Sequence, residues 1–493
     1  MRSPEVILMI VVVAAALIQM SHAAARRSLP LTFIGIAIAA WYAFHPGIPW
    51  QMFPVLAGLL LLMIWQLLQQ RHQSQIDSTR RIYLPLAAII FSAISFGLLL
   101  VVPMFTLPKP TGPYPVGTRI IYLRDTSRIE EKSPRPGMPR ELIVQIWYPA
   151  DLSNNTLATY QRRSETTLGT SYRSVLYTNS RIDAPVATQG GPFPILLFNH
   201  GWAGRRTQDT FLTEDLASHG YVVAAIDHTY NAGRVAMPDN RIIDDAFGFD
   251  PINTEVHTAG QIKNVWNKEL SKWVADETFV LTALQGENLD KKSPWYGHLD
   301  TSRVGAFGHS FGGAASVQVC STDPRFTAGL NMDGWTFGDF SHRLPNQSLM
   351  FMYETDSPAK PKDLNPKDRV ARTESELDTA DMQQIDSSLR KLGGYKLYID
   401  GTSHMDFTDH SLIFPWRNWR DRAHISPERV QTIVRAYVLD FFDKTLRGET
   451  PVLLQNGNTS PFREVHMEQF SPEQKTVSKE TSIQPQSDRQ QTH

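Results

Sequence analysis

The residues best suited to chemistry lie in the stretch Arg303–Ala315, which reads RVGAFGHSFGGAA. Ser310 stands there between Gly308 and Gly312, directly after an apolar run and before a run of small residues. This pattern is typical of a sharp turn from a strand into a helix, which crowds its neighbours and therefore requires glycine on both sides of the serine. The turn exposes the serine hydroxyl above the sheet, and the N-terminus of the next helix favours developing negative charge. The pattern predicts a nucleophile at Ser310, and a tight turn in a binding fold is the alternative.

A nucleophilic serine needs a histidine as its general base, and six histidines follow Ser310 in the chain. The last two lie in a polar C-terminal stretch and are set aside. His404 follows an apolar run that ends at Ile399, and Gly401 allows the chain to turn between them. The catalytic histidine of such hydrolases lies in a loop of this kind. His404 is therefore the predicted base, with the nearby His410 as the alternative.

The acid that orients this histidine has two candidates. Asp333 ends the apolar run that follows the serine turn, and Asp356 comes after the next apolar run. A carboxylate at either position is able to orient His404 and stabilise its imidazolium. The later position is the commoner one in hydrolases, but the residues alone leave both open.

A serine nucleophile also needs two backbone N–H donors for the oxyanion that forms on its substrate. One is the amide of the residue after the nucleophile, Phe311. The other is predicted in the stretch Ile195–Gly204, ILLFNHGWAG, where an apolar run ends in a His-Gly pair. The flexible backbone at Gly201 allows the Trp202 amide to point at the developing charge. A glycine-rich loop that only joins a strand to a helix is the alternative.

The elements that must hold these residues alternate between short apolar runs and helical stretches from about residue 106 to 465. This alternation predicts an α/β domain. The predicted strands are Ile120–Leu123, Leu142–Tyr148, Ile195–Asn199, Val222–Ile226, Val304–Phe307, Ala328–Met332, Leu349–Tyr353 and Lys396–Ile399. The predicted helices are Gln208–His219, Thr258–Leu284, Phe311–Val319, Met382–Leu392 and Pro427–Lys444.

Two polar stretches fall outside this pattern. Residues 355–380 are rich in Pro, Lys, Asp and Thr, which predicts an exposed excursion. Residues 466–493 are rich in Gln, Ser, Lys and Glu and hold few large apolar side chains, which predicts a disordered tail.

The first 105 residues have a different composition from the rest of the 493-residue chain. They hold six of the 48 Lys and Arg residues and two of the 49 Asp and Glu residues. A helix that spans a membrane needs about 20 mostly apolar residues. Four spans are predicted, at 6–24, 29–45, 51–69 and 82–105. Buried core helices are the alternative, but core helices usually carry a polar face and these stretches do not.

The basic residues of this region predict its orientation. They gather in two alternate loops, at Arg26-Arg27 and at 71–81, and the loop between them has none. Basic loops stay in the cytoplasm, so residues 106–493 are predicted to lie outside it, in the periplasm or the extracellular space. A signal peptide cleaved after Ala23 is the alternative, but Glu5 interrupts the basic start that such peptides have.

Composition narrows the classes of function. A net charge of -1 argues against a protein that binds nucleic acid by neutralising phosphates. One cysteine, Cys320, excludes an internal disulfide framework and a cysteine-based zinc site. No metal-ligand cluster is visible in the sequence, so no metal or cofactor is expected.

The region from about 110 to 440 resembles the plasma-type platelet-activating-factor acetylhydrolases, which are α/β-hydrolases that act as calcium-independent phospholipases A2. The matching pieces are Gly112–Gly117 (GPYPVG), Gln145–Pro149 (QIWYP), Asn199–Gly201 (NHG), Asp215–Gly220 (DLASHG), the serine turn, Asp333–Trp335 (DGW) and Gly401–Phe407 (GTSHMDF). They follow one another in the family's order. The four spans are a departure, because the animal plasma enzymes do not have them.

The resemblance implies an α/β-hydrolase fold with Ser310 as nucleophile, His404 as base and Asp333 as acid, since the family places its acid early. It also implies that the amides of Trp202 and Phe311 form the oxyanion hole. Four aromatic residues are expected to line an acyl pocket or to belong to the core: Trp335, Phe337, Phe414 and Trp416.

The expected function is that of a membrane-anchored serine hydrolase. It would cleave carboxylic esters through an acyl-enzyme. The expected esters are those that link short or modified acyl chains to phospholipids. Its expected partners are a lipid or small ester substrate and the membrane. The alternatives are a lipase-like or cutinase-like esterase, an acyltransferase or peptidase on the same triad, and a catalytically dead membrane interaction protein.

Overall fold

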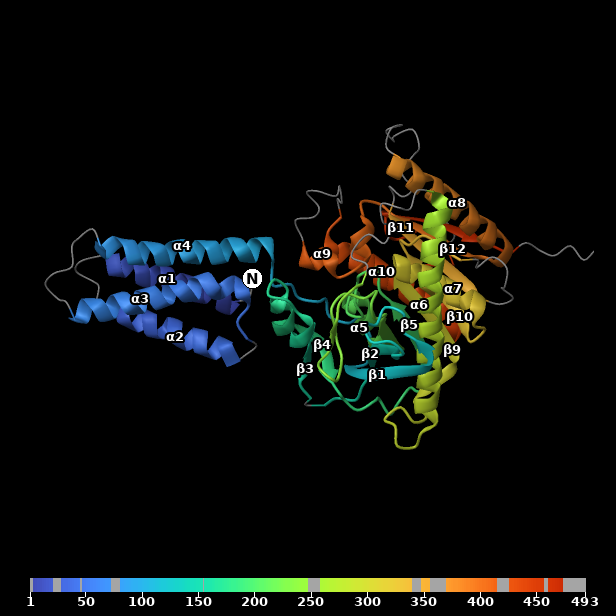
Figure 1. The fold of residues 1–493 in the computed structure, drawn as a ribbon, viewed down its shortest axis with the longest axis horizontal. Helices are drawn as coiled ribbons and strands as arrows, with labels where there is room; N and C mark the ends of the chain where they lie inside the picture. The colour runs from blue at the N-terminus through green and yellow to red at the C-terminus, as the bar shows by residue number, and fades with distance from the viewer. Residues whose placement is uncertain are drawn as a thin grey trace, which may run out of the picture.

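The computed structural model describes residues 3–20, 28–44, 47–71, 80–153, 155–246, 258–338, 347–354, 369–414, 425–455 and 460–472. A bundle of apolar helices, at the left of Figure 1, lies beside a larger α/β domain at the right. The chain leaves the bundle after residue 101 and enters the domain without returning to the bundle.

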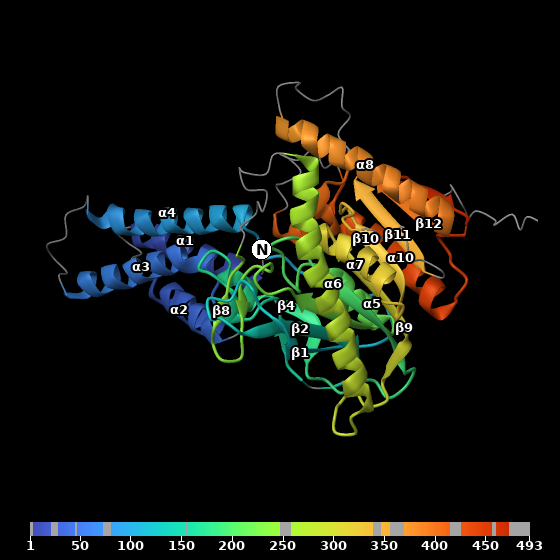
Figure 2. The ribbon, with the colours of Figure 1, turned by 45° about the vertical axis from the view of Figure 1, so that its right-hand side comes forward.

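The bundle consists of α1 (Ser3–Met20), α2 (Leu29–Phe44), α3 (Phe53–Arg71) and α4 (Arg80–Val101). The helices lie alongside one another in both ribbon views (Figures 1 and 2). Small residues allow close packing, since a Cβ on Gly58 of α3 would lie 3.1 Å from the Cα of Ala88 in α4. Large apolar side chains are exposed on the outer faces of all four helices, among them Ile10, Phe33, Leu60 and Ile90.

The predicted spans form helices, but their lengths differ from the prediction. Within the described residues, two stretches of 20 residues are long and apolar enough to cross a membrane, Trp50–Gln69 and Ile82–Val101. The other two helices are shorter, and α2 has 16 residues. At a rise of about 1.5 Å per residue, a helix of that length falls short of a hydrocarbon core of about 30 Å. Length and composition therefore support two of the four predicted spans.

The domain is built on one eleven-stranded mixed sheet in the order β13-β12-β11-β10-β9-β5-β6-β2-β1-β4-β3. Its strands are β1 (Val116–Ile129), β2 (Pro139–Pro149), β3 (Leu157–Thr159), β4 (Tyr177–Ile182), β5 (Phe193–Asn199), β6 (Val222–Asp227), β9 (Leu299–His309), β10 (Phe326–Met332), β11 (Ser348–Glu354), β12 (Gly394–Ile399) and β13 (Val465–Phe470). The six strands from β6 to β12 are parallel, and β2 and β13 flank them in antiparallel orientation. A separate hairpin joins β7 (Val235–Ala236) to β8 (Ile242–Ile243).

Helices cover both faces of the sheet. They are α5 (Thr210–Ser218), α6 (Ala259–Leu289), α7 (Phe311–Thr322), α8 (Arg369–Leu392), α9 (His410–Ile413) and α10 (Pro427–Phe442). Side chains of β5 alternate between the faces, as the pleat of a strand requires. Leu196 and Phe198 belong to the core with α5 and α10, whereas Ile195 and Leu197 belong to the core with α6, α7 and α8.

Local sequence explains where the long helices begin. The Thr258 side chain accepts a hydrogen bond from the Gln261 backbone amide, and the Gln261 side-chain oxygen accepts one from the Thr258 backbone amide, which forms a capping box before α6. Ser426 accepts from the amide of Arg429 and precedes Pro427, the first residue of α10. Both helices therefore start at the residues predicted from the sequence or one residue later.

All eight predicted strands and five predicted helices are present, with three differences. The stretch 466–470 belongs to β13, which pairs with β12, rather than to a disordered tail. Helix α8 begins at Arg369, inside the predicted excursion of 355–380. Strands β3, β4, β7 and β8 were not predicted, because they have two to six residues each and carry polar side chains or turns at their ends. Residues 355–368 and 473–493 lie outside the described residues.

Candidate active site

Ser310 is the single residue between the end of β9 and the start of α7. Its backbone has φ 55° and ψ −125°, a conformation that costs free energy for any residue with a side chain. Hydrogen bonds on both sides hold it there. The Ser310 amide donates to the Met332 carbonyl at 2.8 Å, and the Ser310 carbonyl accepts from the amide of Gly313 at 2.9 Å. Strand β10 and helix α7 therefore fix the position of the serine.

The glycines around Ser310 are required by close approach of the backbone. A Cβ on Gly312 would lie 2.2 Å from the carbonyl oxygen of Asn199, and one on Gly308 would lie 2.4 Å from the carbonyl carbon of Gly312. A Cβ on Gly334 would lie 2.0 Å from the carbonyl oxygen of Ser310. A methyl group fits at none of these positions, so the turn has the crowding that its sequence predicts.

His404 and Asp333 are brought together from two neighbouring parts of the sheet edge. Asp333 follows the last residue of β10, and His404 lies five residues after the last residue of β12. The His404 Nδ1 and Asp333 Oδ2 atoms are 2.6 Å apart, and Asp333 Oδ1 accepts from the Glu354 amide at 3.1 Å. The Asp333 side chain is 4% exposed, while that of His404 is 45% exposed. With Nδ1–H bound to the carboxylate, His404 keeps Nε2 available to take a proton.

Two cavities meet at these residues. The first has a volume of about 480 Å³ and the second about 430 Å³. Ser310, His404 and Trp202 line both, and Asp333 lines the second. The predicted nucleophile, base and early acid therefore share one site, and Asp356 lies outside the described residues.

His410, the alternative base, does not occupy the position next to the Asp333 carboxylate. His410 begins α9, and its ring lies against that of Phe414 with centroids 4.7 Å apart. Both line the first cavity. The Asp333 carboxylate contacts His404, so His410 forms part of the cavity wall.

The loop after β5 passes directly against the nucleophile. A Cβ on Gly201 would lie 3.3 Å from the Cβ of Ser310. The Gly201 carbonyl accepts from the Gly204 amide at 2.8 Å and contacts the Nδ1 of His200 at 2.6 Å. The C=O and N–H groups of a planar trans peptide point in opposite directions, so these contacts also fix the direction of the Trp202 N–H.

The second predicted donor belongs to α7. Phe311 is the first residue of this helix, and the first four amides of a helix have no partner within it. The Trp202 ring packs edge-on against the Phe311 ring with centroids 5.3 Å apart. Trp202 and Phe311 therefore both lie at the site of Ser310, and their role as oxyanion donors stays a prediction.

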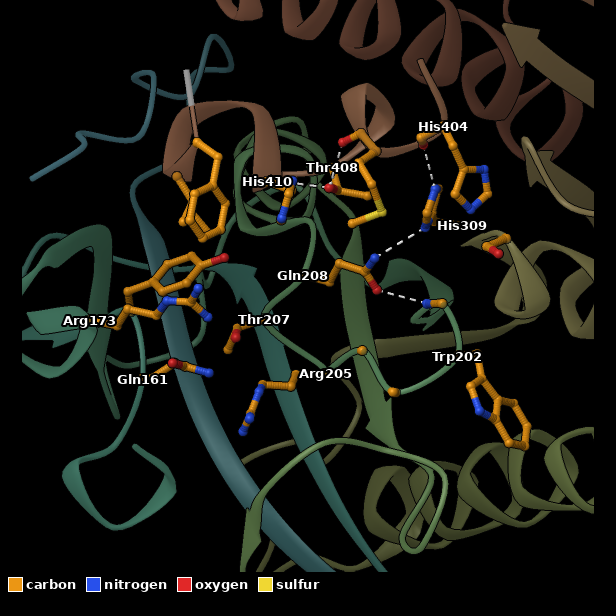
Figure 3. A pocket seen from close by; sticks show the side chains of 18 residues that line it. Gln161, Arg173, Trp202, Arg205, Thr207, Gln208, His309, His404, Thr408 and His410 are labelled. Carbon is orange, nitrogen blue, oxygen red and sulfur yellow. Dashed lines mark hydrogen bonds between the residues drawn. The ribbon is translucent and has the colours of Figure 1, made fainter. Parts of the chain in front are cut away.

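One set of contacts was not predicted from the sequence. The Gly201 amide donates to Gln208 Oε1 at 2.7 Å, Gln208 Nε2 lies 3.1 Å from His309 Nδ1, and His309 Nε2 lies 2.7 Å from the carbonyl oxygen of His404. The Gln208 amide donates to Nδ1, and His309 carries its proton on Nε2 and donates it to the carbonyl. Figure 3 shows this connection, called the Gln208–His309 link below, running from the Gly201 loop to His404. It ties the oxyanion loop to the histidine loop across the end of β9.

A second polar network lies beneath the oxyanion loop. His228 Nδ1 lies 2.9 Å from Asp276, its Nε2 lies 3.0 Å from the Asn199 side-chain oxygen, and its amide donates to His200 Nε2 at 3.3 Å. Burial lowers the pKa of both histidines. Burial alone would raise the pKa of Asp276, but the charge and hydrogen bonds of Arg140 hold it well below its usual range. The network therefore packs two buried histidines against the Asp276 carboxylate, under the loop that it supports.

Three of the four aromatic residues predicted for an acyl pocket line cavities. Trp335 and Phe337 line the second cavity, and Phe414 lines the first. Trp416 lies outside the described residues. Phe337 and Trp266 stack with centroids 5.5 Å apart, so the wall of the second cavity is largely aromatic.

A protein-family model described as platelet-activating factor acetylhydrolase, isoform II, matches residues 101–238 and 284–452. The chain belongs to this family. The matched segments contain Ser310, Asp333, His404, Trp202 and Phe311, whereas the helical bundle up to residue 100 lies outside them.

Relatives of this acetylhydrolase-family chain have modest sequence identity to it. The platelet-activating factor acetylhydrolase of Cavia porcellus is 27% identical over 275 residues, which cover 50% of this chain and 60% of the relative. A probable 1-alkyl-2-acetylglycerophosphocholine esterase of Arthroderma benhamiae is 27% identical over 261 residues, or 48% and 60% of the two chains. The chain thus spans about 60% of the length of these relatives. A solved ferulic acid esterase from Streptomyces cinnamoneus has a TM-score of 0.57 and 27% identity, and the match covers 74% of this chain and 99% of that one.

Proposed function

We propose that this protein is a serine hydrolase that cleaves carboxylic esters. The observation that carries the proposal is the His404–Asp333 contact of 2.6 Å beside a serine held at a strained strand-to-helix turn. The names of its relatives and of the solved structure support the same reaction, since each names an ester-cleaving enzyme.

The geometry supports a two-step acyl transfer. The Ser310 hydroxyl attacks the ester carbonyl while His404 Nε2 takes its proton, and the amides of Trp202 and Phe311 stabilise the oxyanion. His404 then gives the proton to the departing alcohol oxygen as the carbon–oxygen bond of the ester breaks. Water, deprotonated by the same nitrogen, attacks the acyl-enzyme and releases the acid and the free serine. The Asp333 carboxylate orients the His404 ring and stabilises its imidazolium.

The proposed substrates are phospholipids with a short or modified acyl chain. Two of the relatives carry names that refer to acetylated ether lipids or platelet-activating factor. The two cavities of about 480 and 430 Å³ are in the range typical of small-molecule sites, and Ser310 lines both. An ester with one group in each cavity would place its carbonyl at Ser310.

The bundle is proposed to anchor the enzyme in a membrane, with the α/β domain on the extracytoplasmic side. Exposed apolar side chains on all four helices support contact with lipid, and the shorter helices are accommodated by local thinning of the bilayer. Alkaline-phosphatase and fluorescent-protein fusions at the C-terminus report opposite sides of the membrane. We expect phosphatase activity without fluorescence, and the opposite result would reverse the topology.

The direct test of the function is Ser310→Ala. We expect this variant to lose hydrolysis of p-nitrophenyl acetate and labelling by a fluorophosphonate probe, because Ser310 is the proposed site of the acyl-enzyme. Ser302→Ala is the matched control, since Ser302 is exposed on the same strand and binds Asp300 rather than the site. Near-normal turnover by a folded Ser310→Ala protein would contradict the proposal, and loss in both variants would show only a loss of structure.

A further inference from the structure

The first cavity has a cationic end away from Ser310. Figure 3 shows Gln161, Arg173 and Thr207 on the side of the cavity opposite His404, with Arg205 below them. None of the described residues that line this cavity is an aspartate or a glutamate. The cavity therefore joins the nucleophile to two guanidinium groups without a carboxylate in its wall.

Neither guanidinium takes part in an ion pair among the described residues. Arg205 donates to the backbone carbonyls of Arg234 at 2.6 Å and Glu165 at 3.4 Å. Arg173 contacts the hydroxyl of Tyr172 at 3.4 Å. Both arginine side chains are half-buried, so bulk water does not fully solvate their charges.

The carboxylates behind this end are already paired. Arg206 binds both Glu165 and Asp227, and Arg162 also binds Glu165. Burial opposes ionisation of Glu165, but the charge of Arg206 holds its pKa below the usual value. Both carboxylates are thus bound by Arg206, and Arg173 and Arg205 have no carboxylate partner among the described residues.

Two further aspartates near this end do not supply the missing negative charge. Burial raises the pKa of Asp409 to about 8, and burial raises that of Asp209 well above its usual value. Burial therefore opposes the charged form of both aspartates. The Tyr160 hydroxyl, which also lines the cavity, donates to Asp409 at 3.0 Å.

Gln161 adds a second, independent sign of a ligand. The residue is 3% exposed, and its side-chain amide oxygen is buried without a hydrogen-bond partner among the described residues. A buried polar atom without a partner costs free energy, which a ligand hydroxyl at this position would recover. The cationic end therefore also contains an acceptor, the Gln161 side-chain oxygen, that lacks a hydrogen-bond donor among the described residues.

We propose that Arg173 and Arg205 bind an anionic phosphate or carboxylate group carried by the ester whose carbonyl reacts at Ser310. This proposal rests on the proposed function and names the charge of its substrate. The planar fork of a guanidinium matches the oxygen pairs of both groups and forms charge-assisted hydrogen bonds with them. The anion lies in the alcohol part of a phospholipid, or at the far end of an acyl chain that ends in a carboxylate.

The test measures kcat/KM of the full-length protein in detergent on two matched pairs of esters. The acyl pair is p-nitrophenyl butyrate and the p-nitrophenyl monoester of glutaric acid, which differ by a terminal carboxylate. The alcohol pair is monoacetylglycerol and acetylated glycerol 3-phosphate, which differ by a phosphate. The pair in which the charged member is preferred identifies the part of the substrate that carries the anion.

The variants are Arg173→Gln and, as matched control, Arg163→Gln. Arg163 is exposed, lies close to Gln161 in the chain and does not line the cavity, so its loss changes the net charge equally. We expect Arg173→Gln to lower the charged-to-neutral ratio of kcat/KM by roughly tenfold to a hundredfold, mainly through KM. We expect Arg163→Gln to change the ratio by less than about twofold, as for an exposed charge.

Arg205→Lys provides a second variant that keeps the charge but removes the fork. We expect it to lower the same ratio, by less than Arg173→Gln does, because a lysine still attracts the anion as a point charge. The proposal is overturned if wild type shows no preference in either pair, or if the control lowers the ratio as much as Arg173→Gln. A Ser310→Ala protein that retained turnover would instead overturn the function itself, so the two failures are distinguishable.

Discussion

The helical bundle and the α/β domain differ in how their buried polar groups are paired. In the bundle, buried hydrogen bonds join small groups of side chains, such as Tyr42 to Glu5 at 2.6 Å and Gln66 to Thr32 at 2.8 Å. In the domain, charges are buried in networks, such as Arg140 with Asp276. The bundle exposes large apolar side chains along all four helices, whereas the domain buries most of its own. The described residues that line the two cavities belong to the domain, so we propose that the chemistry lies there and that the bundle holds the domain at a membrane.

The sharpest test of this assignment is the acid of the triad. Asp333→Asn should lower kcat by about 10⁴, because an amide at this position stabilises the wrong tautomer of His404. Activity on a p-nitrophenyl ester measures the loss, and circular dichroism checks the fold. Asp356→Asn is the matched control, since it changes the other acid that the sequence offers. If Asp356→Asn proved the more damaging variant, the acid would have to be reassigned.

A smaller effect is expected from the Gln208–His309 link. Gln208→Ala removes the acceptor of the Gly201 amide and the donor to His309, so the oxyanion loop and the histidine loop lose their common support. We expect kcat to fall roughly tenfold to a hundredfold, because small misplacements of catalytic groups have costs of this order. KM for a short ester should change little, since Gln208 does not contact the reacting atoms.

The control for this variant is Gln189→Ala, at an exposed loop position. Both proteins should unfold within a few degrees of wild type, which separates a positioning role from a structural one. If Gln208→Ala lost stability together with kcat, the role of the Gln208–His309 link would be structural. If kcat were unchanged, the link would have no role in catalysis.

The sequence predicted the parts of the site that depend on neighbours along the chain. The serine turn follows from glycines within two residues of Ser310, and the central parallel strands follow from their apolar runs. The Gln208–His309 link joins residues 101 positions apart, so no local pattern reveals it. Strand β13 was missed for a different reason, because its sequence VHMEQF buries only Val465 and Met467 and otherwise resembles a polar tail.

The acid of the triad is a second feature that the local sequence could not decide. Apolar runs placed Asp333 and Asp356 equally well at strand ends, and the resemblance to a family, rather than the pattern, favoured Asp333. The structure brings Asp333 to 2.6 Å from His404, because β10 lies beside β11 and β11 beside β12 in the sheet. Strand order is a property of the whole fold, so it could not be derived from either run alone.

The smallest effect on chemistry is expected from removing the bundle. The described residues that line the two cavities run from Tyr160 to Phe414, so none of them belongs to α1–α4. A fragment of residues 106–472 keeps the eleven-stranded sheet and its covering helices. We expect it to fold alone and to hydrolyse a soluble short-chain ester with a kcat/KM within about twofold of the full-length value, as a domain with its own core does.

On lipids in vesicles the same fragment should be much less efficient, because the bundle no longer concentrates the domain at the surface that holds the substrate. The bundle does contact the domain, where the Trp50 indole donates to the Gly169 carbonyl at 3.0 Å, so the fragment's unfolding temperature must be measured first. Full-length protein with Trp50→Phe loses that contact but keeps the anchor, and it should match wild type on both substrates. A fragment that is folded yet inactive on the soluble ester would show that the helices contribute to the site, and the contrast between the two regions would no longer separate chemistry from location.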